Sequence, residues 1–372
     1  MAQYRLILPG DPAPGFRQRC TSNEAYNFDT VGGRYIVLCF HGTASDAHGK
    51  AMLGLTREVR TLLDDNHLTF FAVSTDPGDL SAQRVRESLP GIRVFWDFDG
   101  LISRLYGAIP ADEAAGEVAF RRLWVIVDPN LRIRSVIPSL PDAGEVPAVI
   151  ETLKNLPPVP LFSGVAVNAP VILLPRVFEP EFCEELISLY ESHGGEDSGF
   201  MQEVNGKTTA VMDYHHKRRS DYIIEDAETR TRLQQRIIRR VVPEIRKVHQ
   251  FEVTRMERYI VARYDSATSD HFRAHRDNTT KGTAHRRFAV SVLLNEDYDG
   301  GELSFPEYGP QRYRTPAGAA IVFSCSLLHE VSRVTRGKRY VFLPFLYDDA
   351  AAAIREANNS YLDDKVGQYR RG

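Results

Sequence analysis

Hydrophobic and polar positions in the first 156 residues predict strands that alternate with helices. Runs of β-branched and aromatic residues are typical of buried strands, whereas apolar residues spaced three and four apart are typical of helices. The expected elements are strands at 34–40 and 68–75, helices at 49–66, 79–89 and 142–156, and a hairpin at 122–138 that turns at Asp128-Pro129-Asn130. This order predicts an α/β layered domain with a mixed sheet.

A proline-rich stretch separates this half from a second one. Residues 156–169, LPPVPLFSGVAVNA, begin with three prolines in five residues, which predicts an extended and fairly stiff connection. The interpretation divides the chain into a first domain at 1–158, a linker at 159–169, a second domain at 170–349 and a tail at 350–372.

The second half is expected to be mainly β with flanking helices. The expected elements are a short strand at 171–175, a helix at 179–193, an irregular polar segment at 199–226, a helix at 227–249 interrupted by Pro243, and β-rich runs at 319–324 and 339–347. The Gly300-Gly301 pair after Asp299 predicts a hairpin turn. The tail begins with helix formers and is expected to dock on its own protein or on a second copy in a homodimer; the pattern leaves both open.

Composition and charge narrow the class of protein. The 372 residues are 43% hydrophobic and 26% charged, which is ordinary for a soluble globular protein, and the net charge of −3 argues against a general nucleic-acid binder. No apolar run is long enough to cross a bilayer, and the N-terminus carries no signal-peptide pattern. The four cysteines do not form a disulfide framework. We therefore expect a cytoplasmic protein that binds neither nucleic acid nor membrane.

The candidate chemistry is a metal site in the second half. On a strand, the side chains of His275 and Asp277 point to the same face, while Arg276 points away. His329 follows much later and is expected at the end of a neighbouring strand, facing the same metal. Two imidazoles and one carboxylate on a β framework are typical ligands of an oxygen-activating ferrous site. Arg339 would begin the next strand, where its guanidinium could hold a carboxylate with two hydrogen bonds.

An ordinary surface cluster of histidines is the alternative interpretation. A histidine and an aspartate two residues apart occur by chance in many proteins. Other histidines compete for any such role, namely His215, His216, His271 and His285. The order of the pair, the distant third residue, the basic residue beyond it and the β-rich segments between them together favour the metal site.

The second half resembles the prolyl-4-hydroxylase-like branch of the Fe(II)/2-oxoglutarate-dependent dioxygenases. The similar segments are APVILLPRVFEPEFCEELISLYE, LLNEDYDGGELSFPE and, most diagnostic, HEVSRVTRGKRYVF. The resemblance implies a double-stranded β-helix, or jelly roll, in which His275, Asp277 and His329 bind Fe(II). It also implies that Arg339 binds the distal carboxylate of 2-oxoglutarate and that Tyr264 contacts this cosubstrate.

The activity implied by the resemblance is hydroxylation of an unactivated C–H bond. O2 and 2-oxoglutarate would be consumed, and succinate and CO2 would be released. A free amino or imino acid similar to proline, or another small metabolite, is the preferred substrate, because no peptide-binding repeat is visible. A prolyl hydroxylase that acts on a protein or peptide is the alternative.

The first domain resembles the peroxiredoxin branch of the thioredoxin fold. The similar segments are GDPAPGF at 10–16, YIVLCFHG at 35–42, FAVSTD at 71–76, FWDFDGLISRLYGA at 95–108 and LWVIVDPNLRIR at 123–134. Arg122 stands where such proteins carry an arginine near the peroxide site. The region that would carry the reactive thiol, 41–53, contains no cysteine. We therefore expect the fold to persist without peroxidase activity, as a packing or docking module.

The remaining cysteines leave one alternative from another class of function. Cys39 falls in a predicted strand and Cys183 in a predicted helix, where cysteine is usually an inert small hydrophobe. Cys20 falls in a stretch with loop character and is the candidate for a reactive thiol. A thiol-based redox or peroxide regulator is therefore the competing hypothesis.

Overall fold

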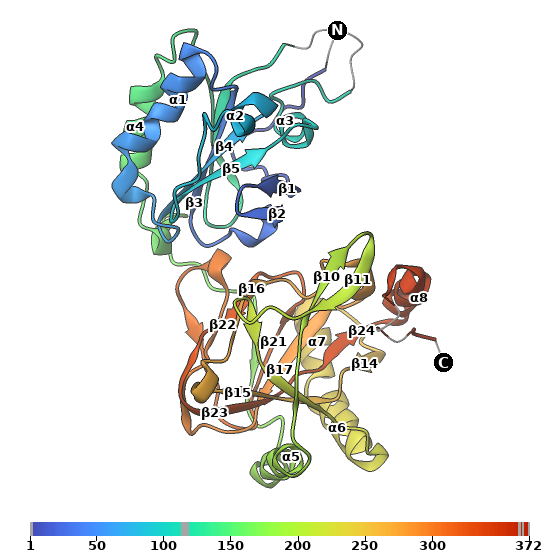
Figure 1. Ribbon diagram of the computed structural model, residues 1–372. Coiled ribbons are helices and arrows are strands. Elements are labelled where there is room, and N and C mark those ends of the chain that lie inside the picture. The colour runs from blue at the N-terminus through green and yellow to red at the C-terminus, as the bar shows by residue number, and fades with distance from the viewer. Residues whose placement is uncertain (1–2, 113–118, 364–365, 367, 371–372) are drawn as a thin grey trace. The chain divides into compact units, whose positions relative to one another are not determined.

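The computed structural model describes residues 3–112, 119–363, 366 and 368–370 (Figure 1). Two compact units are present. The first comprises Met1–Asn168 with Pro306–Pro310, and the second comprises Ala169–Phe305 with Gln311–Gly372. Across the described ranges, no helix has both the length and the apolar character needed to span a membrane.

The first unit is built on a mixed sheet, which has seven strands in the described part of the chain. The strands are β1 (Arg17–Cys20), β2 (Asn23–Asn27), β3 (Tyr35–Gly42), β4 (Leu68–Ser74), β5 (Ile92–Trp96), β6 (Leu123–Val127) and β7 (Ile133–Pro138). Their order is β2-β1-β5-β4-β3-β6-β7, with β3, β4 and β5 parallel and the other pairs antiparallel. Strands β3 and β4 are buried along their whole length, as expected for central strands with both faces covered.

Helices and irregular segments cover the two faces of this sheet. The helices are α1 (Ala47–Glu58), α2 (Pro77–Ser81), α3 (Leu101–Leu105) and α4 (Val146–Lys154). Alternate residues of β3 face opposite cores, so that Val37 packs with α1 and α4 while Leu38 packs with α3. The predicted strands, the hairpin and the closing helix are present, which confirms the α/β layered domain.

Two predicted helices of the first unit are shorter than expected. The helix predicted at 49–66 ends at Glu58, and the chain then turns where Asp64 accepts hydrogen bonds from the backbone of Asn66 and His67. The helix predicted at 79–89 ends at Ser81, because Gln83 adopts a left-handed backbone with φ of 51°. Local polar side chains and a positive φ override the helical spacing at these positions.

The proline-rich stretch is only partly extended. Val159–Leu161 form a 3-10 turn, and the Phe162 side chain is buried in the core that includes α1 and α4. The beginning of this stretch is therefore part of the first unit.

The second unit consists mainly of two antiparallel sheets. The larger sheet contains β8 (Ile172–Leu174), β9 (Glu196–Asp197), β13 (Ser220–Ile223), β14 (Arg255–Glu257), β15 (Ile260–Asp265), β17 (Phe288–Leu293), β18 (Tyr298–Gly300), β21 (Ala320–Ser324), β23 (Val334–Phe342) and β24 (Phe345–Tyr347). The smaller sheet contains β12 (Lys217–Arg218), β16 (His271–His275), β19 (Leu303–Ser304), β20 (Arg312–Tyr313) and β22 (His329–Val331). The smaller sheet has the order β12-β16-β22-β19-β20, which makes β16 and β22 neighbours.

Three helices pack against the larger sheet. They are α5 (Pro180–His193), α6 (Ala227–Arg240) and α7 (Val242–His249). Leu186, Leu233 and Ile245 from these helices share one core with Val261 and Phe342 of the sheet. The break between α6 and α7 lies directly before Pro243, as predicted, because proline is accepted in the first turn of a helix but not in its interior. The predicted fold class is therefore confirmed for both halves.

The polar segment at 199–226 is not irregular, contrary to the prediction. It forms a hairpin of β10 (Phe200–Val204) and β11 (Lys207–Val211), followed by β12 and β13. The turn is Asn205-Gly206, with φ of 51° and 75°, which is the residue pair that favours a tight two-residue hairpin. The Asn-Gly pair is a turn signal in the sequence, but the polar composition around it led to the prediction of an irregular segment.

The Gly300-Gly301 pair does not close a hairpin, also contrary to the prediction. Strand β18, before it, pairs with β23, whereas β19, after it, pairs with β20 and β22. The two glycines instead carry the chain from the larger sheet to the smaller one.

The tail docks on its own protein. It begins with α8 (Asp349–Ala357), as its helix-forming residues predicted. Beyond it, the backbone of Asp363 donates to the carbonyl of Thr208, and Lys207 Nζ donates to the carbonyl of Ser360. The end of the domain thus lies along the β10–β11 hairpin. Assembly into a homodimer stays a prediction.

Candidate metal centre

Antiparallel pairing of β16 with β22 brings the two predicted histidine ligands together. His275 lies opposite His329, and Phe272 lies opposite Val331. Strand β16 therefore contains one more residue between these pairs than β22 does. This extra residue is a β-bulge, a device that reorients side chains near functional sites.

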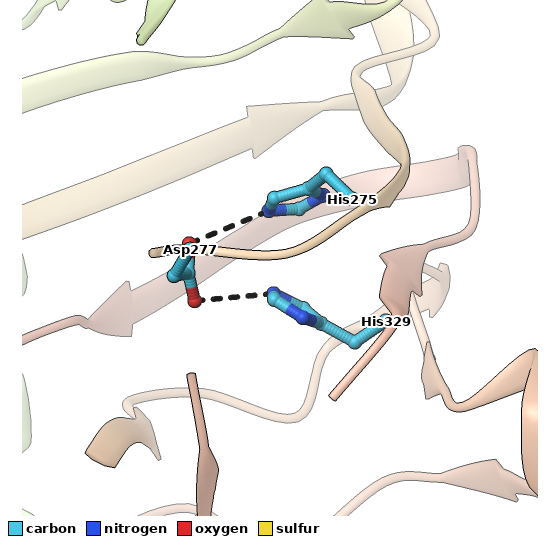
Figure 2. A group of neighbouring side chains, drawn as sticks. All are labelled: His275, Asp277 and His329. Carbon is cyan, nitrogen blue, oxygen red and sulfur yellow. Dashed lines mark ion pairs between the residues drawn. The ribbon is translucent and has the colours of Figure 1, made fainter. Parts of the chain in front are cut away.

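Asp277 completes a compact group of three possible metal ligands (Figure 2). Its Oδ1 lies 3.6 Å from Nε2 of His275, and its Oδ2 lies 3.4 Å from Nε2 of His329. One ligand atom from each of the three residues lies within 4.8 Å of the others. The predicted grouping of these side chains is what the structure contains. The expectation that both members of the pair lie on one strand is wrong, because β16 ends at His275.

Asp277 keeps its position beyond the strand end through its backbone. Its N–H donates to the carbonyl of Cys325 at 2.9 Å. The neighbouring Arg276 points elsewhere, as predicted, and its guanidinium donates to the carbonyl of Ser326. The aspartate thus occupies a short, tethered segment rather than a regular strand.

Hydrogen bonds to the backbone select the tautomer of both histidines. Nδ1 of His275 lies 2.8 Å from the carbonyl of Arg273, and Nδ1 of His329 lies 3.0 Å from the carbonyl of Leu327. A carbonyl can only accept, so each Nδ1 carries the proton and each Nε2 presents a lone pair toward Asp277. This is the arrangement in which histidine commonly binds a metal.

Electrostatics keep the imidazole of His275 neutral and the carboxyl of Asp277 ionised. Burial, together with the neighbouring His329, lowers the pKa of His275 to about 4. Burial acts to raise the pKa of Asp277, but the two imidazoles outweigh it and hold that pKa well below its usual range. At neutral pH His275 therefore offers a neutral nitrogen and Asp277 a negative oxygen, which fits a divalent cation.

Aromatic rings hold the two imidazoles in place. The ring of Phe272 stacks on His275 with centroids 3.4 Å apart and planes inclined by 17°. The ring of Phe323 meets His329 edge-on at 4.7 Å. Ligand orientation thus depends on packing as well as on hydrogen bonds.

The two predicted cosubstrate residues, Arg339 and Tyr264, lie side by side in the core of the second unit. They are directly opposed on β23 and β15, and the guanidinium carbon lies 5.1 Å from the centre of the tyrosine ring. Both side chains are buried, and Nε of Arg339 has no hydrogen-bond partner among the described residues. Arg339 lies within β23 rather than at its beginning, which corrects the prediction. A buried guanidinium with an unused donor is suited to an anionic ligand.

A small, partly open cavity of about 10 Å³ borders Arg339. It is lined from the larger sheet by Ser291 and from the smaller sheet by Leu303, so it lies between the two sheets. Gly301, also in its wall, has φ of 66°, and a Cβ there would lie 2.9 Å from Cδ of Arg339. The absence of a side chain at this position leaves room for the arginine.

The competing histidines have other partners. His271 directs its two ring nitrogens at the carbonyls of Ser269 and His215, and His285 pairs with Glu257 at 3.0 Å. His215 is exposed, and His216 packs on Phe200. Among the described residues, they form no further group of metal-binding geometry. The other histidines therefore do not join the group formed by His275, Asp277 and His329, and the choice between a metal site and an incidental cluster stays a prediction.

Sequence reasoning missed a charged network next to Asp277. Glu257, buried at the end of β14, accepts from Arg286 at 2.8 Å and from Arg355 of α8 at 2.7 Å. Arg286 also donates to the backbone carbonyl of Asp277 at 3.4 Å. The members of this charged network, Glu257, Arg286 and Arg355, come from three distant segments, so no local sequence pattern could have revealed it.

In the first unit, the arginine predicted near a peroxide site has other partners. Arg122 pairs with Asp46 at 2.5 Å and donates to the carbonyl of His41. Asp46 also caps α1 by accepting from the backbone of Gly49. A Cβ at Gly49 would lie 1.9 Å from the carbonyl oxygen of Thr43, so position 49 cannot hold a side chain unless the backbone rearranges.

The four cysteines, Cys20, Cys39, Cys183 and Cys325, are all buried, and burial raises the pKa of each thiol. The loop expected around Cys20 is instead the end of β1, where the side chain is fully enclosed. Reactive thiols are exposed and have lowered pKa values, so the thiol-based hypothesis finds no support in this geometry.

Comparison with known families finds one matching family for part of each half of the chain. Residues 259–347 match the model of the 2OG-Fe(II) oxygenase superfamily, and residues 9–136 match that of the AhpC/TSA family. The chain therefore combines a 2OG-Fe(II) oxygenase domain with an N-terminal AhpC/TSA domain of thioredoxin fold. Both resemblances expected from the sequence are confirmed.

Curated relatives are similar over short stretches of the chain. A PKHD-type hydroxylase of Synechococcus sp. (strain JA-2-3B'a(2-13)) is 50% identical over 54 residues, which are 14% of this chain and 24% of that protein. A PKHD-type hydroxylase of Polaromonas sp. (strain JS666 / ATCC BAA-500) is 42% identical over 88 residues, which are 21% of this chain and 38% of that protein. The chain thus spans less than two fifths of the length of these relatives.

Solved structures of prolyl hydroxylases are similar at low identity. One, from Trichoplax adhaerens, was determined with a peptide fragment of hypoxia inducible factor; it is 16% identical with a TM-score of 0.40, covering 50% of this chain and 86% of that one. A prolyl-4-hydroxylase from Pseudomonas putida is 15% identical with a TM-score of 0.36, and the match covers 48% of this chain and 93% of that one.

Proposed function

We propose that the second unit is an Fe(II)- and 2-oxoglutarate-dependent dioxygenase that hydroxylates an unactivated C–H bond and releases succinate and CO2. The observation that carries this proposal is the mutual geometry of His275, Asp277 and His329, whose ligand atoms converge within 4.8 Å. The donor set, with Nε2 lone pairs and an ionised carboxylate, fits the ferrous sites of such oxygenases. Membership of residues 259–347 in the oxygenase superfamily supports it.

Each residue has a distinct part in this proposal. His275, Asp277 and His329 would hold the iron, which when bound supplies the activation of O2. Arg339 would hold the distal carboxylate of 2-oxoglutarate, because its buried guanidinium has an unused donor beside a cavity. Tyr264, opposite Arg339, would contact the same cosubstrate and keep the guanidinium oriented.

The preferred substrate is a free amino or imino acid similar to proline, or another small metabolite. A prolyl residue within a protein or peptide is the alternative, which the names of the structural neighbours favour. Both substrates present an unactivated C–H bond, so the iron site itself does not distinguish them. The difference must come from groups around the open face of the metal.

The test is Fe(II)-dependent formation of succinate from 2-oxoglutarate across a substrate panel. L-proline, L-pipecolate and L-lysine represent the first class, and proline-rich peptides represent the second. Turnover stimulated by one class identifies the substrate, and His275→Ala should abolish it. If the variant forms succinate as fast as the parent, the proposed ligand set is wrong.

We further propose that the first unit serves packing or docking and not peroxide reduction. The pairing of Arg122 with Asp46 and the burial of every thiol support this. The expected result is that the protein consumes no hydrogen peroxide with a thiol reductant present. Peroxide consumption that Cys20→Ser removes would restore the thiol-based hypothesis.

A further inference from the structure

Buried positive charge is concentrated in the second unit. In the described part of the chain, the buried lysine and arginine side chains are Lys217, Arg219 and Arg339, which are 4%, 5% and 5% exposed. A buried cation is costly unless an anion compensates it. These three residues therefore indicate where negative charge is needed.

Two of the three cations have an anion assigned to them. Arg219 forms two hydrogen bonds with Asp221, at 2.7 and 2.6 Å. Despite its burial, Asp221 has a pKa lowered to about 2 by this guanidinium, so the pair is ionised. Arg339 would face the distal carboxylate of 2-oxoglutarate in the proposed function. Lys217 forms no ion pair among the described residues; the carboxylates of Asp221 and Asp277 act on it only from beyond ion-pair distance, and each has other partners.

Lys217 lies next to the metal centre. It is opposed to Phe272 in the pairing of β12 with β16, and its Nζ lies 5.2 Å from the centre of that ring. The same ring stacks on His275, with centroids 3.4 Å apart. The ammonium group and a proposed iron ligand therefore both pack against one aromatic ring.

The hydrogen bonds of Lys217 leave part of its capacity unused. Nζ donates to Oγ of Ser198 at 2.7 Å and to the carbonyl of Gly199 at 2.6 Å. Both acceptors are neutral, and the third N–H has no acceptor among the described residues. Burial, together with the positive charge of Arg219, lowers the pKa of Lys217 well below its usual value. An added carboxylate would compensate the charge and use the remaining donor.

Aromatic groups surround this position. His216, the residue before Lys217, has its ring 5.6 Å from Phe272 and 6.5 Å from His275. Phe200, at the start of the β10–β11 hairpin, packs on His216 at 4.4 Å. A cation beside aromatic walls suits a small molecule with one carboxylate and an apolar body.

We propose that Nζ of Lys217 binds the carboxylate of the primary substrate, which makes a free amino or imino acid the substrate class. An internal prolyl residue of a peptide has no carboxylate at this position and would leave the ammonium group uncompensated. This inference rests on the proposed dioxygenase function.

The test compares an acid with its amide in three proteins. L-proline and L-prolinamide, and L-pipecolate and its amide, are assayed with the parent, Lys217→Met and Lys217→Arg. The parent should prefer the acids, and Lys217→Met should raise KM for the acids by about 10- to 100-fold, with a smaller change in kcat. Lys217→Arg should restore part of this loss. Lys247→Met, which changes an exposed lysine of α7, is the matched control.

Failure of the inference is distinguishable from failure of the proposed function. Mn²⁺ affinity reports on the metal site in each variant, and substrate-independent 2-oxoglutarate decarboxylation by the parent reports on the proposed function. If the parent shows no decarboxylation, the proposed function fails, and calorimetric binding of the acids and amides to the Mn²⁺-loaded protein still tests Lys217. Equal use or binding of acid and amide by the parent, or an unchanged affinity for the acid in Lys217→Met, overturns the inference. A variant that no longer binds Mn²⁺ is misfolded and is replaced by Lys217→Gln.

Discussion

His275 and His329 face each other across two neighbouring strands, with ring centres 4.2 Å apart and planes inclined by 52°. They are an opposed pair in the antiparallel β16–β22 ladder, and each is oriented by its own backbone hydrogen bond. The two imidazoles are thus presented by the sheet before any metal binds. A preorganised site of this kind should bind divalent cations in a simple 1:1 manner.

Removal of His329 should abolish metal binding. Loss of one of three protein ligands is expected to weaken Mn²⁺ or Co²⁺ affinity by more than about 100-fold, beyond the effect of losing an outer hydrogen-bond partner. Calorimetric titration of His329→Ala measures this. The matched control is His215→Ala, an exposed histidine whose change should leave affinity unaltered. Equal affinity in the two variants would contradict the ligand assignment.

Removal of the guanidinium of Arg339 should affect 2-oxoglutarate but not the metal. Arg339→Met is expected to raise KM for 2-oxoglutarate by about 10- to 100-fold, because the distal carboxylate of the bound cosubstrate loses its charged partner. Arg339→Lys should lose less, since it keeps the charge but not the forked geometry. Steady-state kinetics with varied 2-oxoglutarate, together with Mn²⁺ titration, separates the two effects. A parallel loss of Mn²⁺ affinity would place Arg339 in a structural role instead.

A side chain at Gly301 should displace Arg339. The Cβ of Gly301→Ala would lie 2.9 Å from Cδ of the arginine, so KM for 2-oxoglutarate should rise while Mn²⁺ affinity is kept. The backbone at Gly301 also has a positive φ of 66°, a conformation that alanine adopts only at an energetic cost. Gly194→Ala is the matched control, because Gly194 has φ of 76° and no atom within 4 Å of the added Cβ. A similar change in KM in both variants would attribute the effect to backbone strain alone.

Loss of charge on Glu257 should destabilise the second unit. Glu257→Gln leaves Arg286 and Arg355 without their shared carboxylate and is expected to cost about 3–5 kcal/mol in the free energy of unfolding. Urea unfolding at pH 7 measures this. The partly exposed Glu244, on α7, provides the control Glu244→Gln, which should change stability by less than about 0.5 kcal/mol.

The same residue should make stability depend on pH. Burial acts to raise the pKa of Glu257, but the two guanidinium groups and His285 hold it well below its usual range. Its stabilisation is therefore fully present above the unfolded pKa of about 4.3 and is lost as pH falls toward the folded value. Unfolding between pH 6 and pH 2.5 should show a steeper loss of stability in the parent than in Glu257→Gln. Identical slopes would mean that other carboxyl groups dominate acid unfolding.

The grouping of His275, Asp277 and His329 was predictable from local rules. Alternation along a strand led to the expectation that His275 and Asp277 share one face and that a third ligand comes from a neighbouring strand. The three side chains do meet, although Asp277 lies beyond the end of β16. The bulge in β16 was not predictable, because it depends on the pairing with β22 and leaves no mark in the order of residue types. The position of Asp277 beyond the strand end has the same origin.

Other features depended on contacts that a linear pattern does not encode. Lys217 belongs to the basic run Lys217–Arg219, whose residue types are usually exposed, yet it is buried where β12 pairs with β16 opposite Phe272. The 79–89 helix had the right apolar spacing but ended at Ser81. The Asn205-Gly206 turn differs from these features, because its signal is local and present in the sequence. The polar residues around it led to the prediction of an irregular segment instead of a hairpin.

The additional residue in β16 has a consequence for how this site tolerates deletions. Without Ala274, Arg273 alone would oppose Glu330, and the histidine would still lie opposite His329 as in a regular ladder. What would be lost is the local bend and extra twist that a bulge gives a strand, and with them the present orientation of the imidazole. A homologue without this single position would therefore keep every ligand and the pairing of its strands, yet hold a metal in a different geometry.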